Sequence, residues 1–170
     1  ELPQPPLSAV DDLVVLPCGN VLFQVQSFTV PPAWYRRPHG GGPALRTALA
    51  ETSPADYSDC EVVRDEAVSK DGTRVPITVL RLRGIVLDGT HPTILYGYGG
   101  YGVCQTPGFR GRLRAWIERG GVFAVAHIRG GGEFGETWHR EGSLGHKQNV
   151  FDDFAACARR LVAAGYATRE

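Results

Sequence analysis

The chain has 170 residues, of which 42% are hydrophobic and 9% aromatic, values typical of a folded globular protein. Lys and Arg together number 18, and Asp and Glu also number 18, so the formal net charge is zero. A neutral chain has no excess of basic groups to attract nucleic acid or an anionic membrane surface. No apolar run approaches the roughly 18 residues of a membrane span. We therefore expect a soluble segment, with neither nucleic acid nor a membrane among its partners.

The four cysteines lie far apart in the sequence and include no CxxC pair. This spacing disfavours a zinc knuckle or a thioredoxin-type redox centre, and we expect no metal site. We interpret them as mostly buried thiols in a reducing compartment, which favours a cytoplasmic location. They are Cys18, Cys60, Cys104 and Cys157.

The first fifty residues are rich in strand-forming residues. Val21–Gln26 and Ala33–Arg37 predict two strands, and the proline pair between them indicates a hairpin-like unit. The glycine-rich stretch His39–Pro43 cannot continue a strand, and a polar connection follows it. We expect a domain boundary near this connection, which divides residues 1–51 from residues 52–170.

Two further strands are expected directly after this boundary. Cys60–Val68 and Arg74–Leu82 are β-rich and flank an Asp71-Gly72 pair, which is typical of a tight hairpin turn.

Beyond the hairpin the pattern alternates. His91–Tyr96 predicts a short strand, Phe109–Arg119 a helix, Val122–Ala126 a buried strand and Asn149–Ala164 a second helix. Strand, helix, strand and helix in this order are typical of an α/β fold with a parallel sheet covered on both faces.

The second helix has the clearest local signals. Asn149 can cap its N-terminus, Asp152 and Asp153 can complement the helix dipole in the first turn, and Gly165 follows its end. Apolar residues recur at helical spacing, so we expect their face to pack on the sheet. These residues are Phe151, Phe154, Ala158, Leu161 and Val162.

Two glycine-rich strings match the spacing GxGxxG, Gly97–Gly102 and Gly130–Gly135, and each follows a buried strand. The dinucleotide fingerprint requires a helix to open within the motif, so that its N-terminus faces the phosphates. Neither string is followed at once by a helical pattern. We therefore expect no nucleotide and no cofactor.

The first string occupies another informative position. In α/β-hydrolases the loop after an early strand passes close to the substrate and donates to the oxyanion, which favours glycine. A tyrosine held on such a loop can present its hydroxyl as a donor, whereas Tyr96, nearer the strand, is expected to pack. The alternative is a loop whose tyrosines only fill the core.

Three strings resemble the start of the peptidase domain in prolyl oligopeptidases: His91–Tyr101, Gly121–His139 and Lys147–Phe154. The likeness covers about residues 57–166. It implies that residues 52–170 form the N-terminal part of an α/β-hydrolase peptidase domain. It also implies that residues 1–51 supply strands of the last blade of a β-propeller.

The resemblance carries two site residues. Tyr98 matches the tyrosine whose hydroxyl helps to form the oxyanion hole, and Tyr101 matches a position, usually Phe, that lines the pocket for the substrate proline ring. A tyrosine at this position also resembles the related oligopeptidase B, which prefers to cleave after basic residues. Arg129 and Glu133 are expected to fix the glycine loop between them.

The implied function is that of a serine-type endopeptidase that cleaves short peptides after proline by acyl transfer. The alternatives are an oligopeptidase B-like enzyme that cleaves after basic residues and a noncatalytic binding module.

No GxSxG string occurs in the 170 residues, so we expect the nucleophile to be absent. The resemblance implies that the nucleophile elbow follows shortly after about Tyr166 and that the acid and the base lie further on, so these are expected to be absent as well. The nearest string, Glu141–Gly145, follows no buried strand, so Ser143 is not a candidate. Four histidines are interpreted as packed or surface residues. We expect the chain alone to be inactive, its partners being short peptide substrates and the remainder of the same enzyme as a complementary chain. The histidines are His91, His127, His139 and His146.

Overall fold

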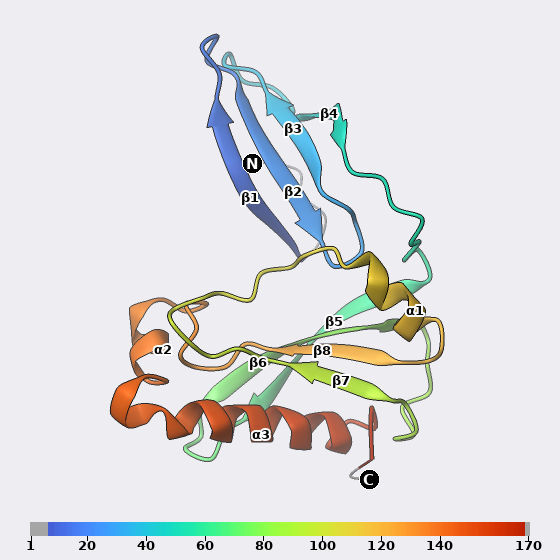
Figure 1. Ribbon diagram of the computed structural model, residues 1–170, viewed down its shortest axis with the longest axis vertical. Coiled ribbons are helices and arrows are strands. Elements are labelled where there is room, and N and C mark those ends of the chain that lie inside the picture. Colours follow the sequence, from blue (N-terminus) through green and yellow to red (C-terminus); the bar gives the residue numbers. More distant parts are fainter. Residues whose placement is uncertain (1–6, 169–170) are drawn as a thin grey trace. The chain divides into compact units, whose positions relative to one another are not determined.

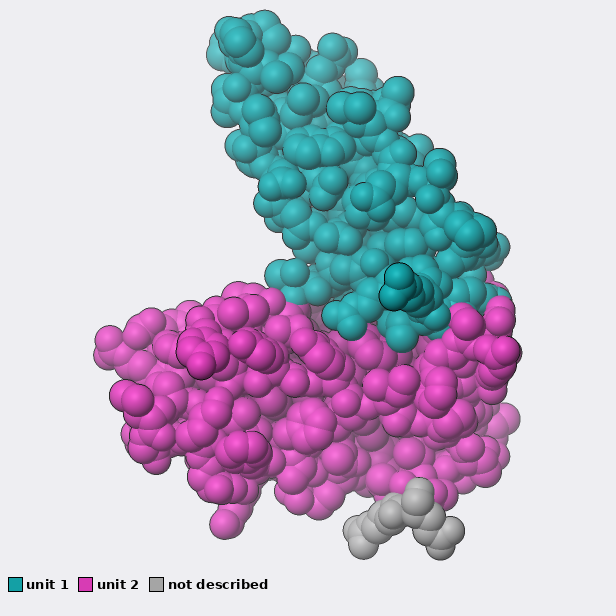
Figure 2. Space-filling view, viewed as in Figure 1, with its two compact units in different colours: residues 1–58, 106–114 teal, residues 59–105, 115–170 magenta. Residues whose placement is uncertain are grey.

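The computed structural model describes residues 7–168 and divides the chain into two compact units. One comprises residues 1–58 with 106–114, and the other residues 59–105 with 115–170 (Figure 2). The assignment of residues 1–51 to a propeller and of residues 52–170 to a peptidase domain stays a prediction. Residues 1–6 and 169–170 of these two ranges lie outside the described residues.

The first unit contains a four-stranded antiparallel sheet in which each strand pairs with the next (Figure 1). The two predicted strands are present as a hairpin, in which Val25 pairs with Ala33 and Phe23 with Tyr35. The rings of Phe23 and Tyr35 stack with centroids 5.8 Å apart. The strands are β1 (Ser8–Val15), β2 (Val21–Ser27), β3 (Ala33–Arg37) and β4 (Leu45–Ala50).

The sequence prediction missed the two outer strands of this sheet. In β1 the register shifts between Val10 and Leu13, where an Asp pair interrupts the apolar pattern. In β4 only Thr47 and Ala50 are not fully exposed, so the strand has almost no apolar face to recognise. Both strands therefore lack the alternation that identifies a half-buried strand from sequence.

The second unit contains a four-stranded mixed sheet in the order β5-β6-β8-β7. The pairs β5–β6 and β6–β8 are antiparallel, and only β7–β8 is parallel. The predicted hairpin of β5 and β6 and the predicted parallel relation of β7 and β8 are therefore confirmed. The antiparallel pair β6–β8, which joins the hairpin and the parallel pair in one sheet, was not predicted. The strands are β5 (Cys60–Val68), β6 (Arg74–Leu82), β7 (Thr93–Tyr96) and β8 (Val122–Ala126).

The hairpin β5–β6 has the bounds that the sequence predicted. Its turn is closed by the hydrogen bond from Ser69 N to Thr73 O, 2.8 Å long. Gly72 has φ +89°, which a residue with a Cβ adopts only under strain. The Asp-Gly signal therefore located both the turn and the strands beside it.

The predicted helix over 109–119 is wrong in most of its length. The structure has one 3₁₀ turn, η1 (Gly111–Leu113), and one helical turn, α1 (Arg114–Ile117). Glycines at 108, 111 and 120 leave a glycine-free run too short for a stable helix. Ile117 is nevertheless fully buried and anchors the turn.

Helix α3 (Gln148–Ala163) lies along one face of the mixed sheet (Figure 1), and its predicted bounds are confirmed to within one residue at each end. Its predicted cap is wrong, and its predicted packing face is confirmed only in part, because Leu161 is buried and Phe154 packs against the core but two other members are exposed. Lys147 occupies the N-cap, while the Asn149 side chain donates to the Glu141 carbonyl over 2.8 Å. Phe151 is 61% exposed and Ala158 is also exposed. The buried face consists of Val150, Asp153, Ala156, Cys157 and Leu161.

The four cysteines carry free thiols. Cys60 and Cys157 are buried, whereas Cys18 and Cys104 are exposed, so the prediction of mostly buried thiols holds for two of the four. Burial raises the pKa of the Cys157 thiol to about 12. Among residues 7–168 no helix has the length and apolar character needed to cross a membrane.

Candidate functional site

The loop over residues 97–102 leaves the carboxyl end of β7 and packs directly against α3. A Cβ added to Gly97 would lie 3.1 Å from Phe154 Cδ2 and 3.2 Å from Ile128 Cδ1. Gly99 has φ +59°, and a Cβ there would lie only 2.6 Å from Val150 Cγ1. The loop can take this path only because these positions are glycine.

The loop over residues 130–135 follows β8 and supports the first loop from behind. Gly102 N donates to Gly130 O over 3.0 Å. A Cβ on Gly130 would lie 2.4 Å from Gly99 O, and a Cβ on Gly132 would lie 2.3 Å from Gly102 O. The two glycine strings thus approach each other backbone to backbone, which is a sufficient physical reason for both.

The segment that follows the second glycine string differs from the sequence prediction. Residues 136–140, predicted as a non-helical segment, form the short helix α2 (Glu136–Arg140) directly after Gly135. The first string is followed by an extended stretch that reaches η1 only at Gly111. No group of His, Cys, Asp and Glu suited to hold a metal ion occurs among the residues that the structure describes.

Both tyrosines that the sequence singled out on the first loop are accessible. Tyr98 is 46% exposed and Tyr101 is 89% exposed. Tyr101 has φ +53°, an uncommon conformation for a residue with a side chain. Tyr96, expected to pack near the strand, is exposed as well. The rings of Tyr98 and Tyr101 are therefore available to a ligand at the carboxyl edge of the sheet.

The Tyr98 ring borders a recess of about 300 Å³ between the loop and α3. The side chains that line it are apolar, so a hydroxyl presented at its edge has few competing polar neighbours. Besides Tyr98, the lining residues are Gly97, Ile128, Val150, Phe151, Phe154 and Ala155.

Arg129 and Asp153 form a buried ion pair beneath the two loops, with exposed fractions of 2% and 0%. Arg129 Nη2 donates to Asp153 Oδ1 over 2.7 Å, and Arg129 Nε and N donate to Oδ2 over 2.9 and 3.0 Å. Arg129 Nη1 also donates to Asp71 in the β5–β6 turn over 2.6 Å. The hydrogen bond from Arg129 holds the pKa of Asp71 well below its usual range. The network joins the turn, the second loop and α3, which supports the interpretation of Arg129 as a loop-fixing residue.

Glu133 fixes the other end of the second loop. Its Oε1 accepts a hydrogen bond from Gln105 N over 2.9 Å and lies 3.8 Å from His127 Nδ1. Burial raises the pKa of Glu133, but the bonds from His127 and from Gln105 outweigh it, so the pKa is lowered overall. Glu133 therefore remains a carboxylate that links the segment after the first loop to the second.

The remaining polar candidates have local structural partners. His127 Nε2 lies 2.8 Å from Thr78 Oγ1, and His139 Nδ1 lies 2.9 Å from Gly130 O. His91 Nδ1 lies 3.0 Å from Gly120 O, and His146 is exposed. Ser143 Oγ donates to Arg140 O over 3.1 Å. These contacts agree with the interpretation of the histidines as packed or surface residues.

Sequence reasoning missed two residues of this region. The sequence places Asp153 in the first turn of the helix, and no signal in the spacing links it to Arg129. Lys147 had no assigned role, yet its ammonium donates to Gly99 O over 2.7 Å. The available signal was a cation at the start of a helix, where acidic or small polar residues are preferred.

Comparison with known proteins gives consistent matches. The family model of the prolyl oligopeptidase family matches residues 107–170. A prolyl endopeptidase of Elizabethkingia miricola is 43% identical over 153 residues, which is 89% of this chain and 21% of that protein. An uncharacterized peptidase of Sinorhizobium fredii is 49% identical over 98 residues, which is 57% of this chain and 14% of that protein.

Solved structures extend the match to nearly the whole chain. In a structural and mechanistic study of two prolyl endopeptidases, one structure superposes with a TM-score of 0.91 and 38% identity, covering 98% of this chain and 24% of the other. Oligopeptidase B from Trypanosoma brucei, with covalently bound antipain, gives a TM-score of 0.85 and 33% identity over 96% of this chain and 24% of the other. The chain thus spans at most about a quarter of these relatives, and it belongs to the prolyl oligopeptidase family.

Proposed function

We propose that this chain supplies part of the active site of a serine-type endopeptidase that acts on short peptides by acyl transfer. In this proposal the Tyr98 hydroxyl is one of two donors to the oxyanion, the second being the backbone N–H after a serine that lies outside these residues. Residues 52–170 are the N-terminal part of an α/β-hydrolase domain, and residues 1–51 supply strands of the last blade of a β-propeller. We place the enzyme in the cytoplasm.

The single observation that carries the proposal is an exposed phenol on a loop whose backbone is fixed from behind. Tyr98 is 46% exposed, while the adjacent Gly99 is wedged against Val150. Stabilisation of an oxyanion requires a donor that is positioned before the charge develops. A tyrosine on a mobile loop would have to be ordered during the reaction, at a cost to the rate. The packing of the glycine loops removes that cost.

The proposed preference for proline rests on the relatives that are named prolyl endopeptidases, one of which covers 89% of this chain at 43% identity. The second candidate is cleavage after basic residues. It is favoured by the hydroxyl of Tyr101 and by the match to oligopeptidase B at 33% identity. Tyr101 is 89% exposed, so its ring is free to contact a substrate side chain in either case.

The test is Tyr98→Phe in the complete polypeptide that contains this segment. Removing one oxyanion donor is expected to lower kcat about 10²-fold with little change in KM. Tyr35→Phe, the same change on a strand of the first unit, serves as the matched control and should leave kcat unchanged. Turnover is measured with chromogenic peptides that carry proline or arginine before the scissile bond, so the ratio of kcat/KM values also decides the specificity.

Two outcomes would contradict the proposal. Equal kcat values for Tyr98→Phe and the unsubstituted enzyme would remove Tyr98 from the oxyanion hole. An intact, folded polypeptide that hydrolyses neither substrate would favour a noncatalytic binding module.

A further inference from the structure

We propose that Lys147 is a positioning residue for Tyr98, because its ammonium holds the carbonyl of Gly99, the residue that directly follows Tyr98. This inference rests on the proposed function of Tyr98 and adds a residue that acts through it. The two residues come from different elements: Tyr98 follows β7, and Lys147 precedes α3.

The contact is direct and reaches the peptide next to Tyr98. Lys147 Nζ donates to Gly99 O over 2.7 Å. On the other side of the same peptide, a Cβ built on Gly100 would lie 3.6 Å from Tyr98 Cε1 and 3.9 Å from Cζ. The Tyr98 ring therefore lies on the side of Gly100 toward which a side chain would project. A rotation of the Gly99–Gly100 peptide would move the backbone to which Tyr98 is joined.

The loop has other tethers, but they act further along it. Val103 N donates to Gly100 O over 3.0 Å, and Gly102 N donates to Gly130 O over 3.0 Å. These bonds fix the carbonyl of Gly100 and the amide of Gly102, and packing against Val150 limits the position of Gly99, but neither bond reaches the Gly99 carbonyl. Glycine has more backbone freedom than any other residue, so a hydrogen bond to that carbonyl adds to the order of the loop. The ammonium of Lys147 provides it, and a charged donor makes a stronger bond than a neutral one.

The position of Lys147 is unfavourable for the helix that it begins. It occupies the N-cap of α3 and makes no side-chain cap hydrogen bond. Ser, Thr, Asp and Asn are preferred at this position, and a cation near a helix N-terminus opposes the helix dipole. Conflicts between local preference and the observed residue are expected where function decides the choice. A role in the helix alone therefore does not account for this lysine, whereas the bond to Gly99 does.

The test is Lys147→Met in the complete polypeptide, since methionine keeps an unbranched stem of similar length and removes the ammonium. We expect kcat to fall about tenfold, because small misplacements of a reacting group are costly, while KM changes less than twofold. The melting temperature should fall by only a few degrees, because the loss of the bond to Gly99 is partly offset by the removal of a charge that opposes the helix dipole. Lys147→Arg keeps a cationic donor and should recover most of kcat.

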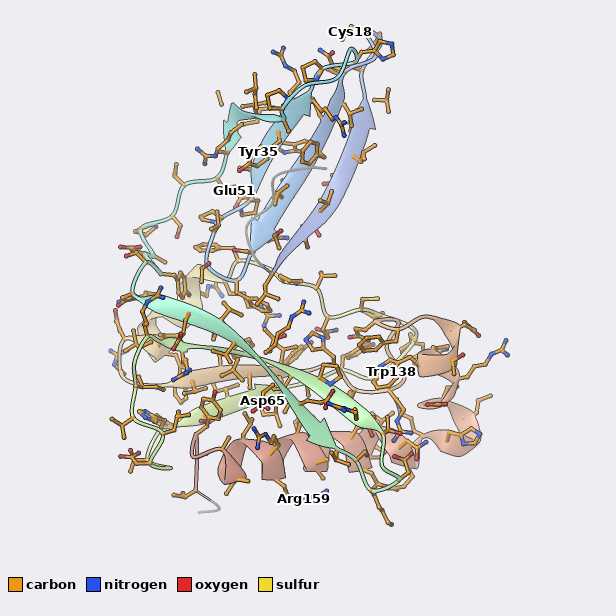
Figure 3. All side chains as sticks on the ribbon, turned by 180° about the vertical axis from the view of Figure 1, so that it is seen from behind. Cys18, Tyr35, Glu51, Asp65, Trp138 and Arg159 are labelled. Carbon is orange, nitrogen blue, oxygen red and sulfur yellow. The ribbon has the colours of Figure 1, made fainter. Side chains whose placement is uncertain are left out.

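Arg159→Met is the matched control. Arg159 is an exposed cation on the side of α3 that faces away from the sheet (Figure 3), and its replacement should leave kcat unchanged. Equal losses in the Lys147→Met and Arg159→Met variants would overturn the proposal, because they would indicate a general effect of charge.

Hydrogen exchange at residues 99–102 separates this inference from the proposed function. These amides should exchange about tenfold faster in Lys147→Met than in the unsubstituted protein, and at an unchanged rate in Arg159→Met. If the unsubstituted polypeptide hydrolyses nothing, the proposed function fails, but faster exchange still supports the tether. Unchanged exchange in Lys147→Met would overturn the tether whether or not the enzyme is active.

Discussion

Asp153 shows how the surroundings of one residue decide its role. Its place in the first part of a helix made it a candidate to complement the dipole, yet it is fully buried against Arg129. A buried carboxylate is tolerated only where an opposite charge and several hydrogen bonds satisfy it. Three donors of Arg129 bond to Asp153, and Ser69 Oγ contacts it as well. Asp153 therefore belongs to the core of the second unit.

Replacement of Asp153 by Asn is expected to destabilise the protein strongly. The amide has the size of the carboxylate but removes the buried negative charge from Arg129, which keeps only the more exposed Asp71 and Glu141 as carboxylate partners. Breaking a buried ion pair typically costs about 3–5 kcal/mol, and we expect a loss near the lower end of that range. Asp152→Asn, the same change one position earlier on a partly exposed side chain, should cost less than about 1 kcal/mol. Urea unfolding followed by tryptophan fluorescence measures both. Similar midpoints for the two variants would show that the buried pair contributes little.

Some residues of the candidate site could be identified from the sequence, but the contacts between them could not. Tyr98 was found because a long ordered string carried it, and its accessibility on the loop agrees with the expectation. The Lys147 contact with Gly99 joins residues 48 positions apart, and the Arg129 contact with Asp71 joins residues 58 apart. Sequence periodicity reports neighbours within one element and carries no information on such pairs.

Among the elements, those with a strong local signal were predicted well. The β5–β6 hairpin has its predicted bounds because the Asp71-Gly72 turn defines where both strands end. Helix α3 was located, but its buried face was placed only in part, because Phe151 was expected inside and the burial of Asp153 was not predicted. From hydrophobicity alone, Phe151 is expected to be more buried than Asp153. The burial of Asp153 depends on Arg129, a partner that lies on another element. The strand order of the mixed sheet was likewise not contained in the local pattern.

The hairpin turn allows a clean test of backbone strain. Gly72 has φ +89°, and a Cβ there would meet no atom within 4 Å, so Gly72→Ala adds strain without a clash. Left-handed backbone conformations cost a residue with a Cβ about 1–2 kcal/mol. Gly145→Ala, at a position with equally open space and no positive φ, is the control and should be close to neutral. Urea unfolding of the two variants gives the difference. Equal stability would mean that the turn relaxes without cost.

For the molecule as a whole, the resemblance seen in sequence strings covers about residues 57–166, whereas one solved structure superposes on 98% of the chain. The added part is the β-sheet of the first unit, whose outer strands have weak sequence signals. Antiparallel strand pairing depends on backbone hydrogen bonds, which many sequences can satisfy, so the fold persists where the pattern fades. Comparison of structures therefore extends the family relation beyond the recognisable strings.

In the proposed function the chain supplies a donor for an oxyanion, but we expect it to contain no group that creates one. An oxyanion hole accelerates attack on a carbonyl only when a nucleophile is present, and no Gly-x-Ser-x-Gly string occurs in the 170 residues. Ser143, in the nearest string, is bonded to the Arg140 carbonyl of its own turn. We therefore expect the pure 170-residue chain to hydrolyse neither prolyl nor arginyl chromogenic peptides, while the complete polypeptide does. Turnover that co-purifies with the short chain and disappears in its Tyr98→Phe variant would contradict this expectation, because it would require a nucleophile within these residues.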